Sequence, residues 1–262
     1  MSFFSRLLRR SPDADGRDPA DGRDPAADPA PDPHALVAEH LEAGRPTGWF
    51  EPLYARAHGD AGAIPWAKLT PHPYVVDWLD DPVADPPGRR AAVVGCGLGD
   101  DAVELARRGY DVVAFDIAAS AVDWARTRFP DAGIDWRVVD VLDLPEDLVG
   151  AFDLVVEVRT VQSLPGVVRD AAMHAVGRLA APGGVVLAVT LVAASTDVSR
   201  SWQGPPWAQA PSELAAYRAA GLERLALEHP DADERGVMEV RLTLQRPAGA
   251  PPPGGGLPIA PA

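Results

Sequence analysis

The sequence contains very little cysteine: Cys96 is the only one among 262 residues. A single thiol excludes a disulfide framework and a zinc site built from several cysteines, and it is compatible with a reducing cytoplasm. The six histidines show no metal-ligand spacing, so we expect no metal site. The predicted location is the cytoplasm.

Long apolar runs and excess positive charge are also missing. The longest strongly apolar run, residues 184–194, falls well short of the ~20 residues that a membrane-spanning helix needs. Residues 1–10 lack the apolar stretch of a secretory signal. The net charge of −14 argues against a large basic surface for nucleic acid. We therefore expect a soluble, acidic protein whose partner is a small molecule, with no nucleic acid and no membrane span; the sequence leaves the oligomeric state open.

Proline and glycine are frequent, with 28 and 24 residues, and proline is concentrated towards the two ends. The motif D-G-R-D-P-A occurs twice in succession near the N-terminus. Segments of this composition bury too little apolar surface to offset the entropy lost on ordering. The predicted organisation is a disordered segment at residues 1–33, a domain at 34–246 that divides into a cap (34–88) and a sheet core (89–246), and a disordered tail at 247–262.

Short apolar runs alternate with helical patterns through the sheet core. The predicted strands are residues 90–94, 111–116, 136–139, 152–158 and 184–192, and the helices between them are 101–108, 118–129 and 166–179. Continuous apolar strands separated by helices are typical of a parallel sheet that is covered on both faces.

The last part of the domain has a different pattern. After a predicted helix at residues 211–220, two strands are expected at 224–228 and 239–245. The segment between these strands is too short for a crossover helix, so they should pair antiparallel. Helices at 34–50 and 75–79 should cover one face. The sequence thus predicts an α/β fold: a Rossmann-like, open, doubly wound sheet of five parallel strands with a C-terminal antiparallel hairpin.

The first predicted strand ends in a glycine loop, V-V-G-C-G-L-G-D-D at residues 93–101. Ligands of open α/β sheets bind at the carboxyl ends of the strands, and glycine lets a ligand approach the main chain closely. The spacing is G-x-G-x-G rather than the G-x-G-x-x-G of dinucleotide loops. Asp100 and Asp101 would repel a pyrophosphate and attract a ligand with a positive sulfonium and ammonium; capping of the next helix is the alternative role.

Two more acids end the next two predicted strands. Asp116 follows the glycine loop by about 20 residues, the distance at which an acid accepts hydrogen bonds from ribose hydroxyls; the alternative is a helix cap. Asp140 can accept from an adenine amino group while the amides of Val141 and Leu142 face the ring edge, and Asp143 is the competing candidate nearby.

These motifs together resemble those of the class I S-adenosylmethionine-dependent methyltransferases. The resemblance covers residues 93–101, 115–117, 140–145, 152–157 and 182–184. It implies S-adenosyl-L-methionine as cofactor, with the glycine loop at the methionine part and the strand that ends near Glu157 facing the transferable methyl. The cofactor-binding residues that we predict are Trp49, Trp66, Gly95, Cys96, Gly97, Asp100, Asp116, Ile117, Asp140, Val141, Leu142 and Glu157.

The segment before the sheet is similar to a narrower group, the thiopurine, halide and tellurite methyltransferases. The similar residues are 48–54 (G-W-F-E-P-L-Y), 64–67 (I-P-W-A) and 71–79. In that group tryptophans of this region lie over the cofactor, which implies the same place for Trp49 and Trp66. Core packing is the alternative for both side chains.

The predicted function is in-line transfer of a methyl group to a small-molecule nucleophile. Such a reaction needs alignment of nucleophile and methyl, exclusion of water and, for some acceptors, a base. The polar candidates near the methyl are Glu157, Arg159, Gln162 and His72, and none completes a catalytic motif, so no catalytic residue is assigned. The alternatives are an NAD(P)-dependent oxidoreductase of the Rossmann type and a non-catalytic S-adenosylmethionine-binding module.

Overall fold

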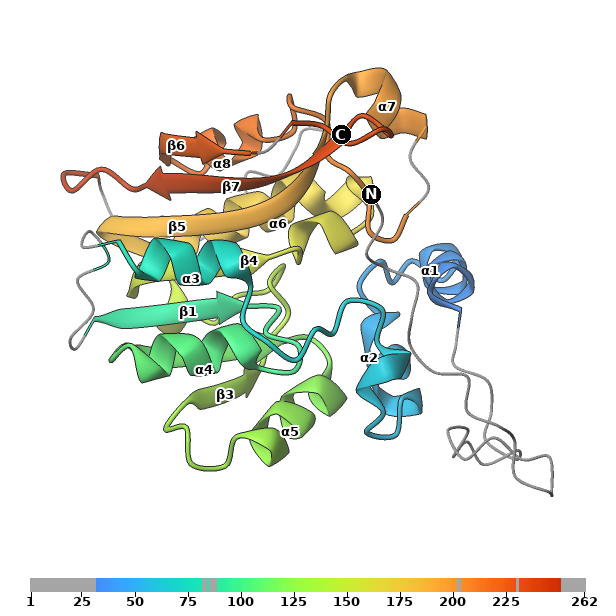
Figure 1. Ribbon diagram of the computed structural model, residues 1–262, viewed down its shortest axis with the longest axis horizontal. Helices are drawn as coiled ribbons and strands as arrows, with labels where there is room; N and C mark the ends of the chain where they lie inside the picture. Colours follow the sequence, from blue (N-terminus) through green and yellow to red (C-terminus); the bar gives the residue numbers. More distant parts are fainter. Residues whose placement is uncertain (1–31, 82–83, 85–88, 202–203, 230, 251–262) are drawn as a thin grey trace, which may run out of the picture. The chain divides into compact units, whose positions relative to one another are not determined.

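The computed structural model describes residues 32–81, 84, 89–201, 204–229 and 231–250. Its centre is a seven-stranded sheet in the order β3-β2-β1-β4-β5-β7-β6 (Figure 1). The strands are β1 (Arg90–Val94), β2 (Asp111–Asp116), β3 (Asp135–Val138), β4 (Phe152–Val158), β5 (Ala180–Ala193), β6 (Glu223–Glu228) and β7 (Val237–Gln245). Strands β1 to β5 run parallel, while β7 pairs antiparallel with both β5 and β6. The predicted fold class is confirmed.

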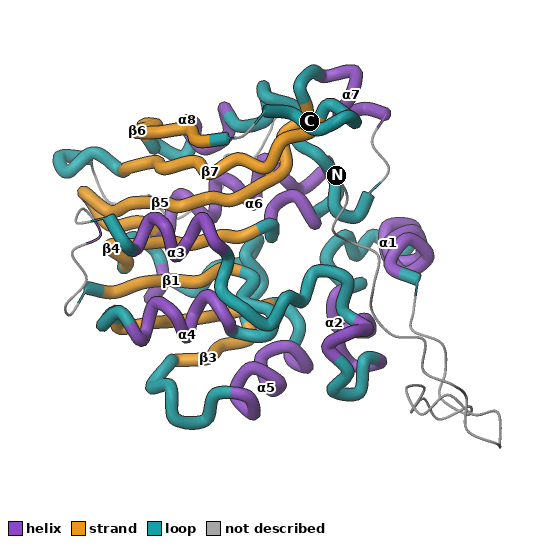
Figure 2. Tube along the Cα trace, in the orientation of Figure 1, coloured by secondary structure: helices purple, strands orange, loops and turns teal. Residues whose placement is uncertain are grey.

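Helices connect the strands and cover the sheet (Figure 2). The α-helices are α1 (Pro33–Glu42), α2 (Phe50–Arg56), α3 (Pro73–Leu79), α4 (Asp100–Arg107), α5 (Ala119–Arg128), α6 (Gly166–Leu179), α7 (Thr196–Ser201) and α8 (Ala215–Ala219). Short 3-10 helices are η1 (Ala61–Ala63), η3 (Glu146–Leu148) and η4 (Val161–Ser163). Among the described residues, no helix combines the length and the apolar character that crossing a membrane requires.

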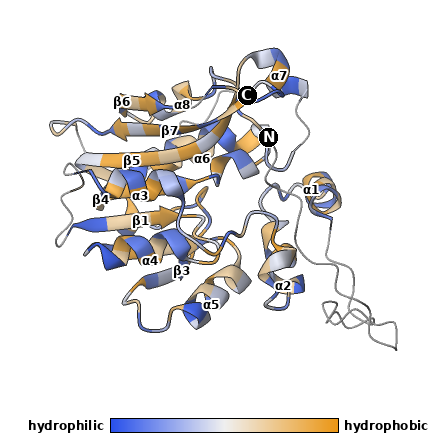
Figure 3. Cartoon of the chain, in the orientation of Figure 1, coloured by the Kyte–Doolittle hydropathy of each residue, from blue (hydrophilic) through white to orange (hydrophobic). Residues whose placement is uncertain are grey.

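Successive residues of the central strands face two different helix layers. Val93 of β1 belongs to a buried cluster with Leu105 of α4, whereas the next residue, Val94, belongs to a cluster with Met173 of α6. This alternation follows from the two-residue period of a strand. Figure 3 shows the matching colours, with apolar residues concentrated in the strands and hydrophilic residues on α4. Both faces of the sheet are therefore buried, as a doubly wound fold requires.

The single helix predicted for residues 34–50 is wrong, because the chain forms two helices with a turn between them. Gly44 has a φ of +67°, a left-handed conformation that ends helices and that glycine adopts without a steric penalty. Pro46 follows, and its missing N–H could not have continued the helix. Helix α1 also begins at Pro33, where Asp32 accepts a hydrogen bond from the His34 N–H at 3.0 Å. The predicted disorder of residues 1–31 and 251–262 lies outside the described residues.

A hydrogen-bonded pair fixes the N-terminal segment to the sheet core. Glu51 in α2 accepts hydrogen bonds from the Ser120 N–H at 3.0 Å and from the Ser120 hydroxyl at 2.5 Å. Ser120 lies in the first turn of α5, so a carboxylate from another helix satisfies an N–H that has no partner within α5 itself. This contact places α2 beside α5 at the edge where the parallel strands end (Figure 1).

Candidate cofactor and acceptor site

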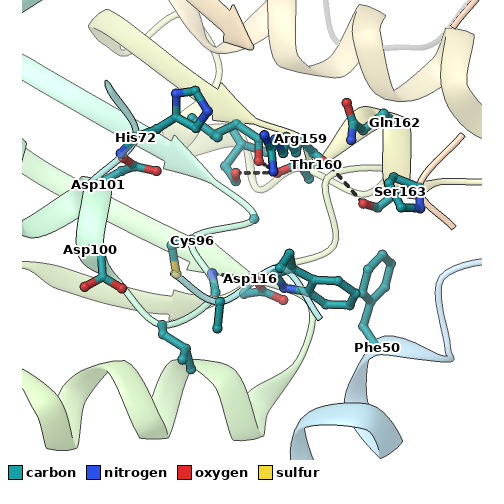
Figure 4. A pocket seen from close by; sticks show the side chains of 18 of the residues that line it. Phe50, His72, Cys96, Asp100, Asp101, Asp116, Arg159, Thr160, Gln162 and Ser163 are labelled. Carbon is teal, nitrogen blue, oxygen red and sulfur yellow. Dashed lines mark hydrogen bonds between the residues drawn. The ribbon is translucent and has the colours of Figure 1, made fainter. Parts of the chain in front are cut away.

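A cavity of about 970 Å³ lies at the carboxyl ends of the parallel strands. The loops after β1, β2, β3 and β4 line it, together with α2 and residues 65–74 of the N-terminal segment (Figure 4). Ligand sites in proteins measure roughly 300–1,000 Å³, so this cavity is at the upper end of that range. It has room for a cofactor and a second small molecule.

The glycine loop forms one wall of the cavity and needs glycine for its shape. Gly95 and Gly97 have φ values of +62° and +50°. A Cβ atom on Gly95 would lie 2.4 Å from the Thr160 hydroxyl, and one on Gly97 would lie 3.0 Å from the Tyr54 hydroxyl. Both glycines, and Cys96 between them, line the cavity. A ligand can therefore approach the main chain at this loop.

Asp116 connects the glycine loop to the start of α5. Its side chain is buried and lines the cavity; Oδ2 accepts from the Gly97 N–H and Oδ1 from the Ala118 N–H, both at 3.0 Å. Burial raises the pKa of Asp116, although these backbone N–H groups act to lower it. A carboxylate oxygen can accept a second hydrogen bond, so the structural role leaves capacity for a donor of a ligand. Ile117, the next residue, also lines the cavity.

The two aspartates that follow the glycine loop have different partners. Asp100 forms two hydrogen bonds of 2.8 Å with Arg128, so its charge is balanced within the protein. Asp101 accepts the His72 N–H at 2.7 Å, and within the described residues it has no ion pair with arginine or lysine. Burial raises the pKa of Asp101. The prediction named Asp100, but Asp101 is the carboxylate that faces the cavity without a cation.

Asp140 and Val141 line the cavity after β3, whereas Leu142 does not. The Leu142 N–H donates to Asp140 Oδ1 at 2.9 Å, so this amide closes a turn instead of facing a ligand. The predicted contact of the Leu142 amide with the adenine edge is therefore corrected. Asp143, the competing candidate, is exposed and is absent from the cavity lining.

Aromatic side chains of the N-terminal segment form another wall of the cavity, and only one of the two predicted tryptophans belongs to it. Trp66 lines the cavity and donates from Nε1 to the Tyr54 hydroxyl at 2.9 Å. Trp49 is fully buried against Phe50, with ring centroids 4.0 Å apart, and does not line the cavity. Phe50 and Tyr54 complete the wall. The sequence offered a signal for them, because residues four apart share one face of a helix.

Glu157, which was predicted to contact the cofactor, does not line the cavity. Its side chain is fully buried and accepts hydrogen bonds from the Thr160 N–H at 3.0 Å, the Val161 N–H at 3.3 Å and the Tyr217 hydroxyl at 3.1 Å. Burial raises the pKa of Glu157 to about 7, against the opposing effect of these hydrogen bonds. Glu157 thus holds the turn after β4 to α8, and its predicted contact with the cofactor is corrected.

Glu157→Gln is expected to stabilise the protein at pH 8 much more than at pH 5. The pKa of Glu157 is higher in the folded chain than its ordinary value of 4.5, so its contribution to stability is present at low pH and is lost as the pH rises through about 7. Glutamine removes the buried charge and keeps an acceptor. We expect the melting temperature to rise by on the order of 5 °C at pH 8. Glu146→Gln, at an exposed carboxylate, is the control; an equal gain at both pH values would contradict the assignment.

Cys96 does not have the properties of a nucleophile. Burial and the nearby Asp116 raise the pKa of the Cys96 thiol well above its ordinary value, and the thiolate is the reactive form. Within the residues that the structure describes, no group of three His, Cys, Asp or Glu side chains could hold a metal ion.

His72, Arg159 and Glu239 form a connected group in the cavity lining. His72 Nδ1 accepts the Tyr74 N–H at 3.2 Å, and Nε2 lies 3.4 Å from Glu239 Oε1. Arg159 Nε donates to the same oxygen at 2.6 Å. Burial acts to raise the pKa of Glu239, but His72 and Arg159 hold it below the ordinary value. Glu239 comes from β7 and was not predicted, because only the pairing of β7 with β5 brings it here.

Comparison with known proteins bears on this arrangement directly. A family model described as a methyltransferase domain matches residues 92–184, which include the glycine loop, Asp116 and Asp140. This segment is therefore similar to the methyltransferase domain family. The match agrees with the predicted enzyme class and cofactor over this segment.

Relatives of the methyltransferase domain include the ubiquinone biosynthesis O-methyltransferase of Dechloromonas aromatica (strain RCB). The two are 30% identical over 122 residues, or 46% of this chain and 51% of the relative. The chain thus spans about half the length of the curated relatives it matches. These relatives are ubiquinone biosynthesis enzymes, so the finer resemblance to the thiopurine, halide and tellurite group stays a prediction.

Solved structures share the fold over a larger part of the chain. The N-methyltransferase NodS from Bradyrhizobium japonicum WM9, solved with S-adenosyl-L-homocysteine, has a TM-score of 0.54 at 18% identity and covers 66% of this chain and 86% of its own. A structure reported for the conversion of a disulfide bond into a thioacetal group in echinomycin biosynthesis has a TM-score of 0.59 at 19% identity, with coverage of 78% and 93%. At these identities the similarity establishes the fold.

Proposed function

We propose that the chain transfers a methyl group from S-adenosylmethionine to an oxygen or nitrogen atom of a small molecule. The observation that carries the proposal is the set of carboxylates around one cavity at the carboxyl edge of the sheet: Asp101, Asp116 and Asp140. The similarity of the segment before the sheet adds sulfur nucleophiles and halides as a further class of acceptor to be tested.

The chemistry of these residues fits the cofactor. S-adenosylmethionine carries a positive sulfonium and ammonium, ribose hydroxyl donors and an adenine amino donor, and the cavity offers acceptors for each. Asp101 would hold the positive methionine part, Asp116 the ribose and Asp140 the adenine, with Ile117 and Val141 as apolar contacts. When bound, the cofactor supplies a methyl group that is activated by positive sulfur.

The protein's own contribution is alignment and exclusion of water rather than strong base catalysis. Trp66 and Tyr54 cover the cavity from the N-terminal segment, and enclosed sites of this kind keep water from the reacting atoms. His72 could act as a base at Nδ1 only by giving up the hydrogen bond from the Tyr74 N–H that begins α3. Holding two reactants in line accounts for a large part of the rate enhancement of displacement reactions.

Activity is tested with methyl-labelled S-adenosylmethionine and a panel of phenols, amines, thiols and iodide. We expect the label to appear in an organic product together with S-adenosylhomocysteine. Binding of S-adenosylhomocysteine without transfer to any acceptor would favour the non-catalytic binding module. Binding of NADH in place of S-adenosylhomocysteine would favour the oxidoreductase.

Asp140→Ala is expected to weaken the affinity for S-adenosylhomocysteine by about tenfold, the free energy of roughly one hydrogen bond to a charged acceptor. Asp143→Ala is the matched control, because it removes an exposed carboxylate from the same loop. We expect the control to bind as the wild type does in a calorimetric titration. Equal losses in the two variants would mean that the loop contributes only charge.

A further inference from the structure

Gln162, in η4 directly after β4, has an amide nitrogen without a partner. The side chain is fully buried and lines the cavity. Its Oε1 accepts the Leu191 N–H at 2.5 Å and lies 3.2 Å from the Thr190 hydroxyl. The orientation of the amide is therefore fixed, since a flipped amide would bring its NH₂ group against the Leu191 N–H. Nε2 is left with no hydrogen-bond partner among the described residues.

A second donor, on a side chain that is 35% exposed, lies three positions before it along the same wall. Arg159 directs Nε and Nη2 to Glu239 Oε1, at 2.6 and 2.5 Å, while Nη1 has no such contact in the described part of the chain. The Arg159 N–H donates to the Val189 carbonyl at 2.7 Å, and its carbonyl accepts the Ser163 hydroxyl at 2.9 Å. The backbone is thus held at both ends, and Figure 4 shows Arg159 and Gln162 on the side of the cavity that also carries Thr160 and Ser163.

A buried donor without a partner, such as Gln162 Nε2, is destabilising, and such groups in native proteins usually have a functional explanation. Both donors lie in the loop after β4, whereas the three carboxylates assigned to the cofactor lie at or after the ends of β1, β2 and β3. That position suits the molecule that receives the methyl group rather than the cofactor. A ligand with an oxygen acceptor would satisfy the free N–H groups.

The charges of the cavity lining determine whether a carboxylate or a carbonyl oxygen of the ligand fits. Glu239 balances the charge of Arg159, Gln162 is neutral, and Asp101 adds a negative charge to the same cavity. A carboxylate ligand would therefore meet two carboxylates, whereas Lys68, the other cation of the lining, is exposed to solvent. A carbonyl oxygen can accept from both donors without that repulsion. Pro205, Leu164 and Tyr74, also in the cavity lining, provide apolar surface for the remainder of the ligand.

We propose that Gln162 and Arg159 form the acceptor subsite and bind a carbonyl oxygen of an uncharged, mainly apolar acceptor molecule. This inference rests on the proposed function, since it assigns the second substrate of the same cavity. It makes Gln162 a specificity-determining residue, with no part in holding the cofactor.

Three probes of similar size test the subsite: acetophenone, benzoate and ethylbenzene. Their affinities for the full-length protein are measured by ligand-observed NMR, with and without saturating S-adenosylhomocysteine. We expect acetophenone to bind about 3–10-fold more tightly than ethylbenzene, as one or two hydrogen bonds between uncharged groups predict, and more tightly than benzoate.

Two variants separate the donor from the rest of the side chain. Gln162→Leu removes donor and acceptor, and Gln162→Glu keeps the acceptor for the Leu191 N–H but removes the Nε2 donor. Both should lose the preference for acetophenone while the affinity for S-adenosylhomocysteine stays within about twofold of the wild type. Gln245→Leu is the control, because the Gln245 amide donates to the Gly183 carbonyl at 3.1 Å, outside the cavity.

The possible results distinguish a failure of the acceptor subsite from a failure of the proposed function. Equal binding of acetophenone and ethylbenzene, tighter binding of benzoate, or a preference that survives Gln162→Glu would overturn the subsite and leave the proposed function standing. Failure of the wild type to bind S-adenosylhomocysteine, with the acetophenone preference intact, would overturn the proposed function instead. Thermal melts identify a variant that fails to fold, and the other variant then carries the test.

Discussion

Gly97→Val is expected to abolish detectable binding of S-adenosylhomocysteine, a loss of at least about 100-fold in affinity, or ~2.7 kcal/mol. Two effects act together. Gly97 has a φ of +50°, which a β-branched side chain adopts only with strain. The added Cβ would also lie 3.0 Å from the Tyr54 hydroxyl, and the valine methyl groups would fill space that the ligand needs. Calorimetric titration of the purified variant measures the loss.

Gly133→Val is the matched control for strain without obstruction. Gly133 has a φ of +66°, and a Cβ there would meet no atom within 4 Å. We expect this variant to melt at a lower temperature than the wild type and to bind S-adenosylhomocysteine unchanged. If Gly97→Val binds as well as Gly133→Val, the glycine loop is not the binding loop.

Asp116→Ala is expected to lower the affinity for S-adenosylhomocysteine by about 10–100-fold, or ~1–3 kcal/mol, and also to lower the melting temperature. The two changes have separate causes. The melting temperature falls because the Gly97 and Ala118 N–H groups lose their acceptor. The affinity falls because the ribose hydroxyls lose theirs.

Adenosine and adenine distinguish the ribose contact from simple helix capping. Competition titrations should show that Asp116→Ala lowers the affinity for adenosine more than the affinity for adenine, because adenine has no ribose. Asp111→Ala, at the exposed opposite end of β2, should leave both affinities unchanged. Equal effects on adenosine and adenine would reduce Asp116 to a structural residue of the loop.

Much of the fold could be predicted because burial on both faces leaves a local signature. The apolar runs that gave residues 90–94, 111–116 and 152–158 coincide with β1, β2 and β4. The helices of the N-terminal segment were harder, because the pattern of residues 34–50 continues through Gly44, where the φ of +67° ends α1. Helix α7 was missed altogether, since its sequence has no apolar face for a pattern to detect.

Site residues could be predicted from the sequence where they follow directly after a strand. They could not be predicted where contacts between distant parts of the chain decide their role. Asp116 and Asp140 follow strand ends, and both line the cavity. The pairing of Asp100 depends on Arg128, 28 residues away, and no local pattern reports it. Glu157 shows the same limit. The sequence does not tell which face of β4 meets the cavity, and the Tyr217 hydroxyl that donates to Glu157 comes from α8.

The most direct test of the proposed methyltransferase is calorimetric titration of the full-length protein with S-adenosylhomocysteine and, separately, with NADH. The carboxylates Asp101, Asp116 and Asp140 predict saturable, stoichiometric binding of S-adenosylhomocysteine and none of NADH, whose pyrophosphate they would repel. Binding of NADH with no response to S-adenosylhomocysteine would contradict the assignment of this cavity.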